Sequence, residues 1–264
     1  MQRIKQLSNQ MDPPQTFPSV NVGNSIFKVA TKIKYPQFIP YRVTASLNQE
    51  ELLHLKWMIQ KGNLNQDMFL IGPPSPLKRN LAMIYAMLGQ REVEYVALSR
   101  DVTDADLKQR REIRNGTAYY VDQACVRAAI HGRILILDGV EKAERNVLPI
   151  LNNLLENRDM ALDDGRFLVD PKRYDELMMN QTSKSQVQKS NLVRTSEDFI
   201  VIALGSPVPK YEGFPLDPPF RSRFQARFIN FPSTEILLNS FTATGMTKVI
   251  AAATTLQNTE SDQG

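Results

Sequence analysis

Five short apolar segments separated by helical patterns constrain the fold of this chain more than any other feature. They occupy residues 68–71, 92–98, 133–137, 199–204 and 226–231. Between them, apolar side chains recur at intervals of three or four residues, which is typical of amphipathic helices. Strands that are apolar on both faces are typical of a parallel sheet covered by helices on both sides. The sequence therefore predicts an α/β fold with a five-stranded parallel sheet in a three-layer αβα core.

Polar and glycine residues predict where two of these helices begin and end. Asn48 is a suitable N-cap, because its side-chain oxygen can accept a hydrogen bond from the first turn. Glu50 and Glu51 in that turn favour the helix dipole, and Gly62 can end the helix. The helix that follows the first strand is predicted to end before Gly89.

Two dipeptides predict β-hairpins that interrupt the alternation of strands and helices. Asn115-Gly116 precedes an aromatic strand, and Asp164-Gly165 lies between two short apolar segments. Both dipeptides suit a type I′ turn, in which the two central residues have positive φ. Residues 170–195 are polar and are predicted to form a surface loop.

The two ends of the chain differ in composition from its centre. Residues 1–40 carry five prolines around two short apolar stretches, which predicts an extended N-terminal arm. The predicted core domain occupies residues 41–232. The tail, residues 233–264, has no strong amphipathic face and is predicted to be poorly ordered.

Composition and charge argue against several classes of function. The net charge is only +4 and the charges are dispersed, so we expect no nucleic-acid partner. No apolar run reaches the roughly 18 residues that span a bilayer, so we expect a soluble protein with no transmembrane segment. The single cysteine, Cys125, is expected to be a buried helix residue, and His54 and His131 lack metal-ligand spacing.

The turn after the first apolar segment reads as a degenerate phosphate-binding loop. The intact form is G-x-x-x-x-G-K-[ST], in which backbone N–H groups cradle phosphates, the lysine reaches the terminal phosphates and the hydroxyl binds magnesium. Here Leu77 replaces the second glycine and Arg79 replaces the hydroxyl, while Lys78 is retained. An anion site can survive at the helix N-terminus, but magnesium binding is in doubt. The loop consists of Gly72, Pro73, Pro74, Ser75, Pro76, Leu77, Lys78 and Arg79.

Two acidic residues follow the third apolar segment. Asp138 ends that segment, where a phosphate-binding α/β fold holds magnesium, and a capping aspartate is the alternative. The next residue is Gly139, at the position where the intact pattern has a water-polarising glutamate. Glu141 could substitute as a catalytic base only if the turn brings it back toward the γ-phosphate.

Three further polar residues are candidates for contacts with a nucleotide. Ser206 follows the fourth segment and could contact the attacking water, or it could be a turn serine before proline. Arg221 and Arg223 lie at the rim of a helix before the fifth segment. They could reach a phosphate held by a neighbouring subunit, or they could form a solvated face.

Taken together, the degenerate loop, the two hairpins, the strand ending at Asp138, the Ser206 strand end and the Arg-Ser-Arg-Phe segment resemble a AAA+ ATPase module of the dynein-related, midasin and MoxR branch. The resemblance covers about residues 25–232. Five segments resemble more narrowly the first AAA+ module of one family of large mitochondrial proteins. They are residues 69–74, 91–101, 106–114, 141–149 and 217–227.

The resemblance implies ATP and Mg²⁺ as cofactors and a mitochondrial location. It makes residues 72–79 the nucleotide loop, Asp138 the magnesium-side acid and Ser206 the sensor-1 position. Arg223 becomes the arginine finger, with Arg221 second, which implies self-association or assembly with other AAA+ modules in a ring. The sequence ends where the helical lid with its sensor-2 arginine would begin, so the lid is expected to be missing.

Two functions remain open at this point. The first is an ATP-binding module, with hydrolysis expected for the full-length family but slow or absent in this chain. The second is a non-catalytic assembly module with a degenerate nucleotide site, which Leu77 and Gly139 favour.

Overall fold

The computed structural model describes residues 19–22, 25–30, 33–41, 47–180 and 191–231 of this 264-residue chain. The predicted poorly ordered tail, the position of the lid and most of the predicted N-terminal arm therefore lie outside the described residues. Within the described part, no helix has the length and apolar character needed to cross a membrane.

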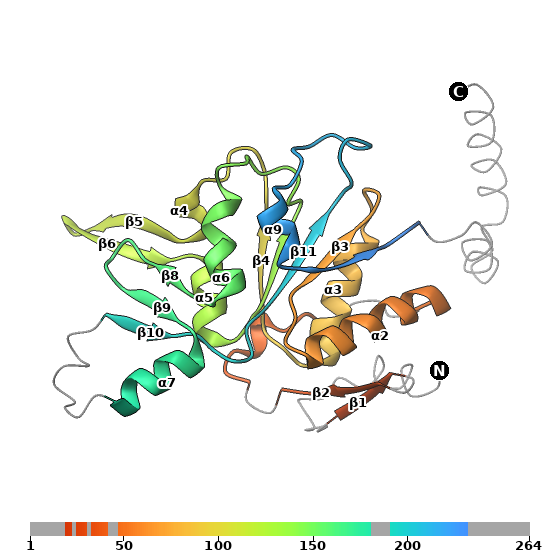
Figure 1. The fold of residues 1–264 in the computed structure, drawn as a ribbon, viewed down its shortest axis with the longest axis horizontal. Coiled ribbons are helices and arrows are strands. Elements are labelled where there is room, and N and C mark those ends of the chain that lie inside the picture. The colour runs from red at the N-terminus through yellow and green to blue at the C-terminus, as the bar shows by residue number, and fades with distance from the viewer. Residues whose placement is uncertain (1–18, 23–24, 31–32, 42–46, 181–190, 232–264) are drawn as a thin grey trace.

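The central sheet has five strands, all parallel, as the apolar segments predict (Figure 1). Their order across the sheet is β12-β3-β11-β7-β4. The fifth strand is shorter than its apolar segment and ends three residues before Phe231. The strands are β3 (Met68–Ile71), β4 (Val93–Ala97), β7 (Ile134–Asp138), β11 (Ile200–Gly205) and β12 (Gln225–Phe228).

Helices cover both faces of this sheet, which confirms the predicted α/β class. Along β7, Ile134 and Ile136 belong to one buried cluster, whereas Leu135 and Leu137 belong to the other. Helices α2 (Gln49–Asn63) and α3 (Leu77–Leu88) pack on the first face. Helices α5 (Ala124–His131), α6 (Asn152–Glu156) and α9 (Pro218–Ser222), with the 3₁₀ helix η2 (Leu148–Leu151), pack on the second (Figure 1).

Helix α2 begins as predicted but continues past the glycine expected to end it. Asn48 accepts a hydrogen bond from the Glu51 backbone N–H, and the Glu51 carboxylate accepts one from the Asn48 N–H. At the other end, the residue with positive φ (52°) is Asn65, and Gly62 lies inside the helix. The prediction for Gly62 is therefore wrong, because Asn65 makes the left-handed turn. Helix α3 ends before Gly89 as predicted.

The two predicted hairpins are present, but only one has the predicted turn. β5 (Gln109–Arg114) and β6 (Thr117–Asp122) are joined by Asn115 and Gly116, whose φ values of 51° and 76° match a type I′ turn. Between β8 (Met160–Ala161) and β9 (Phe167–Val169), Gly165 has φ 86° but Asp164 does not have positive φ. The Leu162 N–H donates to the Arg166 carbonyl, so this is a three-residue loop with glycine in its left-handed position.

Two segments predicted to be irregular contain regular structure. Residues 171–180 form helix α7 (Pro171–Asn180), and β10 (Leu192–Arg194) pairs parallel to β9, so the predicted surface loop is wrong for these residues. Residues 181–190 lie outside the described part. Asp170 accepts hydrogen bonds from the N–H groups of Lys172 and Arg173 and thereby supports the start of α7. At the N-terminus, β1 (Ser19–Val22) and β2 (Ser25–Lys28) form an antiparallel hairpin, followed by η1 (Pro36–Phe38).

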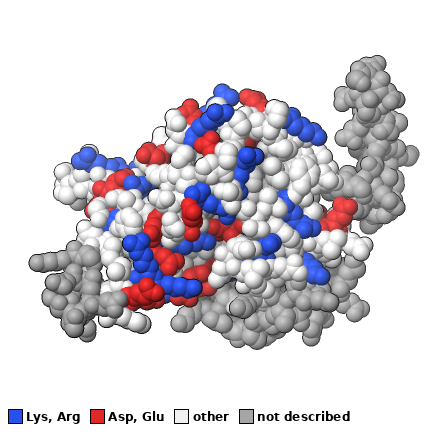
Figure 2. Space-filling view, in the orientation of Figure 1, with Lys and Arg blue, Asp and Glu red and all other residues white. Residues whose placement is uncertain are grey.

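The charges on the face of the molecule shown in Figure 2 are of both signs and interspersed. The short helix α4 (Asp104–Leu107) and the β5–β6 hairpin extend to one side of the sheet, together with β8, β9 and β10 (Figure 1). The opposite side carries α2, α3 and the β1–β2 hairpin. The loops at the carboxyl ends of β3, β7 and β11 meet at one edge of the sheet, where the candidate site lies.

Candidate functional site

The turn after β3 is held in a narrow space. The Gly72 N–H donates to the Gly205 carbonyl at the end of β11 (3.1 Å). A Cβ atom at position 72 would lie 2.0 Å from the carbonyl oxygen of Ile229, so only glycine fits between these two segments. The position of Gly72 is thus fixed by Gly205 at the end of β11 and by Ile229 directly after β12.

Lys78 lies in the first turn of α3, but its side chain folds back onto the loop. Its Nζ donates to the carbonyl oxygens of Gly72 (2.8 Å) and Pro73 (2.5 Å), and the residue is only 5% exposed. Burial lowers the pKa of Lys78, while the nearby charges of Glu141 and Asp138 act to raise it. Both acids are therefore close enough to Lys78 for their charges to act on it.

The backbone donors of the loop are fewer than in an intact phosphate loop. Pro73, Pro74 and Pro76 have no N–H group. The N–H groups of Leu77, Lys78 and Arg79 begin helix α3, so they have no partner within the helix, and Pro76 provides no side-chain cap. The backbone N–H groups at the start of α3 are therefore still available as donors, and they favour binding of an anion.

Arg79 and Asp138 form the closest contact between the loop and the opposite acid. Arg79 Nε and Nη2 lie 2.8 Å and 2.6 Å from Asp138 Oδ2. The Tyr95 hydroxyl donates to the same oxygen. Because β11 lies between β3 and β7, Asp138 is not on the strand adjacent to the loop, and the long arginine side chain spans the gap.

Tyr95 supports this contact from the edge strand β4. The Arg79 guanidinium carbon lies 5.4 Å from the centre of the Tyr95 ring, within the range of a cation–π contact. Burial, together with the hydrogen bond and charge of Asp138, raises the pKa of Tyr95 to about 12. Tyr95 was not predicted from the sequence, because it lies inside an apolar strand. Its alternation with Val93 places it on the same side of β4 as that buried residue, but does not indicate a contact with Asp138.

The residues that should bind magnesium do not fit that ion in this structure. Arg79 stands where the hydroxyl ligand is needed, and its guanidinium already occupies Oδ2 of Asp138. A magnesium ion about 2.1 Å from that oxygen would lie against a positive charge. Among the described residues, no group of three or more His, Cys, Asp or Glu side chains could hold a metal ion.

Glu141 is brought back to the same edge by a tight turn. The N–H groups of Gly139 and Val140 both donate to the Leu204 carbonyl, and Gly139 has φ 82°. Glu141 is 4% exposed, and its Oε2 has no hydrogen-bond partner. A Cβ atom on Gly205 would lie 3.1 Å from that oxygen, which places the carboxylate beside the end of β11. The turn thus brings Glu141 back to the edge of the sheet where Lys78 lies, and the role of Glu141 as a base stays a prediction.

Ser206 and the two arginines occupy different surroundings. Ser206 directly follows Gly205, so it lies at the edge of the sheet between the loop and Asp138. Arg223 Nε donates to the Asn152 carbonyl (3.1 Å), and its guanidinium also contacts Glu156, so it is tied to α6. Arg221, in the last turn of α9, is exposed. The structure brings Lys78, Arg79, Asp138 and Glu141 together, but it does not bring either arginine into this group.

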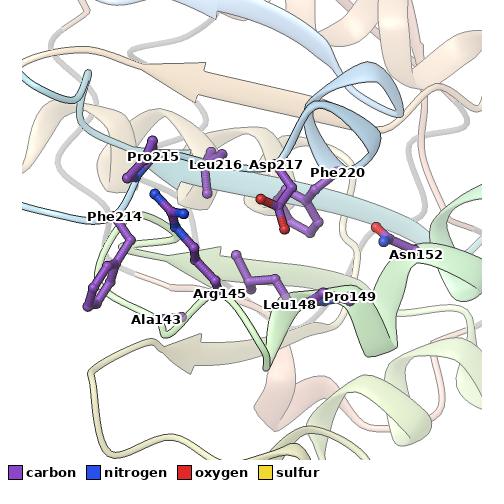
Figure 3. Close-up of a pocket in the computed structure, with 10 residues that line it drawn as sticks. All are labelled: Ala143, Arg145, Leu148, Pro149, Asn152, Phe214, Pro215, Leu216, Asp217 and Phe220. Atoms are coloured by element: carbon purple, nitrogen blue, oxygen red, sulfur yellow. The ribbon is translucent and has the colours of Figure 1, made fainter.

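A small cavity lies apart from these residues, between the segment that follows Glu141 and the start of α9. Its volume is about 10 Å³, which is room for about one water molecule. Leu148, Phe214 and Phe220 are among its lining residues (Figure 3). It is too small for a nucleotide, and neither Lys78 nor Asp138 lines it.

Comparisons with known proteins agree with this architecture. The sequence profile described as "AAA domain (dynein-related subfamily)" matches residues 67–224. The chain is 53% identical over 251 residues to "von Willebrand factor A domain-containing protein 8" of Mus musculus, which covers 92% of this chain and 13% of that protein. This chain therefore spans about an eighth of the length of that relative.

A solved structure shares the fold. It is the crystal structure of a proposed ATPase from Cytophaga hutchinsonii, with a TM-score of 0.53 and 12% sequence identity. The match covers 77% of this chain and 53% of the other. At this identity the likeness concerns the fold alone.

Proposed function

Because this chain belongs to the dynein-related subfamily of AAA domains, we propose that it binds ATP at the start of α3 and hydrolyses it slowly or not at all. One observation carries the proposal: the N-terminus of α3, with Lys78 and Arg79, meets Asp138 and Glu141 at one edge of the sheet. A helix N-terminus with two basic side chains suits the phosphates of a nucleotide.

Binding requires one rearrangement. The Lys78 ammonium must leave the carbonyl oxygens of Gly72 and Pro73 to reach a phosphate. The two carbonyl acceptors are neutral, whereas a phosphate oxygen carries negative charge and attracts the ammonium more strongly. A phosphate can therefore compete for Lys78, although part of its binding energy is used in breaking the two existing bonds.

Slow turnover follows from the placement of the acids. Gly139 stands where a water-polarising glutamate is expected, and Glu141 is buried near Lys78. A general base must be within hydrogen-bond reach of the water it activates, and it must accept a proton at the operating pH. Glu141 is only 4% exposed, so a water molecule has little access to its carboxylate, and we expect little acceleration from it.

Calorimetric titration of the protein with ATP tests the binding proposal. We expect saturable binding that the Lys78→Ala change weakens by about 10-fold or more, because a hydrogen bond to a charged group is lost. Lys172→Ala, a change of an exposed lysine on α7, is the matched control and should leave the affinity unchanged. Absence of saturable binding, or binding indifferent to the Lys78 change, would remove the nucleotide site.

A steady-state phosphate-release assay tests the turnover proposal. We expect a rate at or near background, with no further loss in Glu141→Gln. Turnover that Asp138→Ala or Glu141→Gln abolishes would show that the module is catalytic. That result would contradict our proposal that hydrolysis is slow or absent, but it would leave the binding proposal intact.

A non-catalytic assembly module is the second candidate, and the charge pairing favours it. Without any ligand, Lys78 is hydrogen-bonded to its own loop and Arg79 is paired with Asp138. The two basic side chains of the site therefore have partners within the protein, whereas the Oε2 atom of Glu141 has none. An absence of ATP binding together with retained self-association, measured by light scattering, would support this alternative.

The assembly and the cellular location are also proposals. The resemblance to ring-forming AAA+ modules supports self-association or association with other AAA+ modules. The sequence resemblance to a family of large mitochondrial proteins supports a mitochondrial location. Light scattering over a range of protein concentrations tests the first. Fractionation of cells that express the tagged chain tests the second.

A further inference from the structure

The pairing of Arg79 with Asp138 bears on whether a magnesium ion is needed when a nucleotide binds at this site. This inference rests on the proposed function, because it requires that ATP binds at the start of α3. In an intact loop, the residue at the position of Arg79 supplies a hydroxyl to magnesium, and the ion neutralises the phosphates. Here the same position supplies a permanent positive charge.

The geometry gives this guanidinium a fixed place. Its Nε and Nη2 lie 2.8 Å and 2.6 Å from one oxygen of Asp138, and its plane lies near the ring of Tyr95. The hydrogen bond that Arg79 donates to Asp138 raises the pKa of Arg79. A pre-positioned side chain loses less conformational entropy when a ligand binds, so the contact favours recognition of an anion.

The guanidinium also has donors to offer. Arginine carries five N–H groups in a planar fork that matches the oxygens of a phosphate, and Asp138 uses only part of them. The Arg79 side chain is 54% exposed, whereas the Asp138 side chain is 20% exposed. The arginine is therefore the more accessible of the two side chains to a phosphate.

The local charges favour an anion over a further cation. Lys78, Arg79 and Lys142 outnumber Asp138 and Glu141 by one positive charge. Lys142 lies over Gly139, where a Cβ atom would be 3.1 Å from the lysine Cδ, and its charge acts on Lys78. A divalent ion placed among these groups would face three cations and two carboxylates, one of which is paired with Arg79. A polyphosphate in the same place would be attracted by the net positive charge.

We propose that Arg79 takes the place of magnesium at this site, so that the chain binds the phosphates of ATP without a divalent cation. The carboxylate of Asp138 then orients the arginine and is a positioning residue, not a metal ligand. The ligand class is a nucleoside polyphosphate, whose binding at this site needs no magnesium ion.

Titration of the full chain with ATP, in excess EDTA and in excess magnesium, tests this proposal by calorimetry. We expect the two dissociation constants to agree within about threefold, because a magnesium ion that makes no contact with the site does not change the affinity for ATP. Binding that is lost in EDTA and restored by magnesium overturns this inference and leaves the proposed function standing. Absence of saturable binding in both conditions overturns the proposed function, and this inference with it.

Arg79→Thr is the decisive variant, because it restores the hydroxyl of an intact loop and frees Asp138. We expect its affinity in EDTA to fall about 10- to 100-fold, as for the loss of a charged hydrogen-bond donor, and magnesium to recover part of the loss. Arg100→Ala, which removes an exposed arginine near the end of β4, is the matched control and should keep the wild-type affinity in both conditions. Unchanged affinity of Arg79→Thr in EDTA contradicts the proposal.

Asp138→Asn separates the two roles of the acid and keeps the test informative if Arg79→Thr does not fold. If Asp138 orients Arg79, the ratio of affinities in magnesium and in EDTA stays near one in this variant. If Asp138 binds magnesium, the change lowers the affinity in magnesium alone. A selective loss in magnesium therefore overturns the proposal.

Discussion

Gly62 in α2 lies directly against the side chain of Tyr85 in α3: a Cβ atom at position 62 would be 1.9 Å from the Tyr85 hydroxyl oxygen. The two helices therefore approach each other at a point where one of them has no side chain. The aromatic ring of Phe27 packs on the same tyrosine, with 4.8 Å between the ring centres. This contact joins α2, α3 and the β1–β2 hairpin on one face of the sheet.

Replacing Gly62 by alanine is expected to destabilise the protein, although alanine is the better helix former by about 1 kcal/mol. The methyl group would force Tyr85 or the helix to move, and overpacking of a buried contact costs about 1 to 3 kcal/mol. Urea unfolding measures the difference. The double variant Gly62→Ala with Tyr85→Phe removes the hydroxyl and should lose less stability than the sum of the two single changes. If the stability losses of the two single variants simply add in the double variant, the Tyr85 hydroxyl is not what excludes a side chain at position 62.

The carboxylate of Glu92 is expected to make stability depend on pH. It accepts hydrogen bonds from the backbone N–H groups of Lys34 (2.9 Å) and Tyr35 (2.7 Å) and from Arg133 Nε (2.7 Å). Burial acts to raise the pKa of Glu92, but these bonds outweigh it, and the pKa lies below its ordinary value. A lowered folded-state pKa adds stability that is present above the unfolded pKa of about 4.3 and is lost as pH falls through the folded value.

Glu92→Gln tests this dependence. At pH 7 we expect the variant to be about 1 to 3 kcal/mol less stable than the wild type, because charge-assisted bonds are lost. Below about pH 4 the difference should narrow, since the wild-type carboxylate also becomes neutral. Glu144→Gln, at an exposed position, should stay within about 0.5 kcal/mol of the wild type. A difference that does not change with pH would refute the role of the charge.

Cys125 should be unreactive until the protein unfolds. It is fully buried in α5, and burial, with the nearby charge of Glu94, raises its pKa to about 12. The thiolate is the reactive form, so almost none is present at neutral pH. Iodoacetamide is expected to label the native protein at the rate of unfolding, and urea should make labelling rapid. Fast labelling of the native protein would show that α5 opens locally.

The two arginines near α9 should differ in their effect on stability. Arg223 is bonded to Asn152 and Glu156, and its side chain is 18% exposed, so Arg223→Ala is expected to cost about 1 kcal/mol in unfolding free energy. Arg221→Ala, at an exposed position, should change stability by less than about 0.5 kcal/mol. Arg221 is the more exposed of the two arginines. Urea unfolding of both variants measures the difference. A larger loss of stability in Arg221→Ala than in Arg223→Ala would contradict this expectation.

Much of the fold could be predicted because local pattern and burial agree. The segments at β3, β7 and β11 are apolar on both faces, and the structure buries them between two helical layers. Helix α7 was not predicted, because its residues are polar on average and lie within a longer polar segment. The turn at Asp164 was mistaken, because Asp-Gly suits both a two-residue and a three-residue loop.

Part of the candidate site was predicted, but its contacts were not: Arg221 and Arg223 lie apart from Lys78 and Asp138, and the roles of these residues stay predictions. The loop residues and Asp138 were identified from spacing, and both lie at the same edge of the sheet. The inward fold of Lys78 and the pairing of Arg79 with Asp138 depend on side-chain rotamers and on the strand between them. The spacing of residues in the sequence gives neither the rotamers nor the order of the strands. The role of Tyr95 depends on the same tertiary contact, which joins residues 43 positions apart.

The order of strands in the sheet also bears on how the chain is made. β3 is among the first strands to be synthesised, yet both of its neighbours, β11 and β12, come near the end of the described chain. The Val201 N–H that bonds to Asp67, just before β3, lies 134 residues later. At about 5 to 20 residues per second, a ribosome needs of the order of ten seconds to cover that interval. Throughout that time both edges of an apolar strand lack their native partners, so chaperones that shield the nascent chain should raise the yield of folded protein.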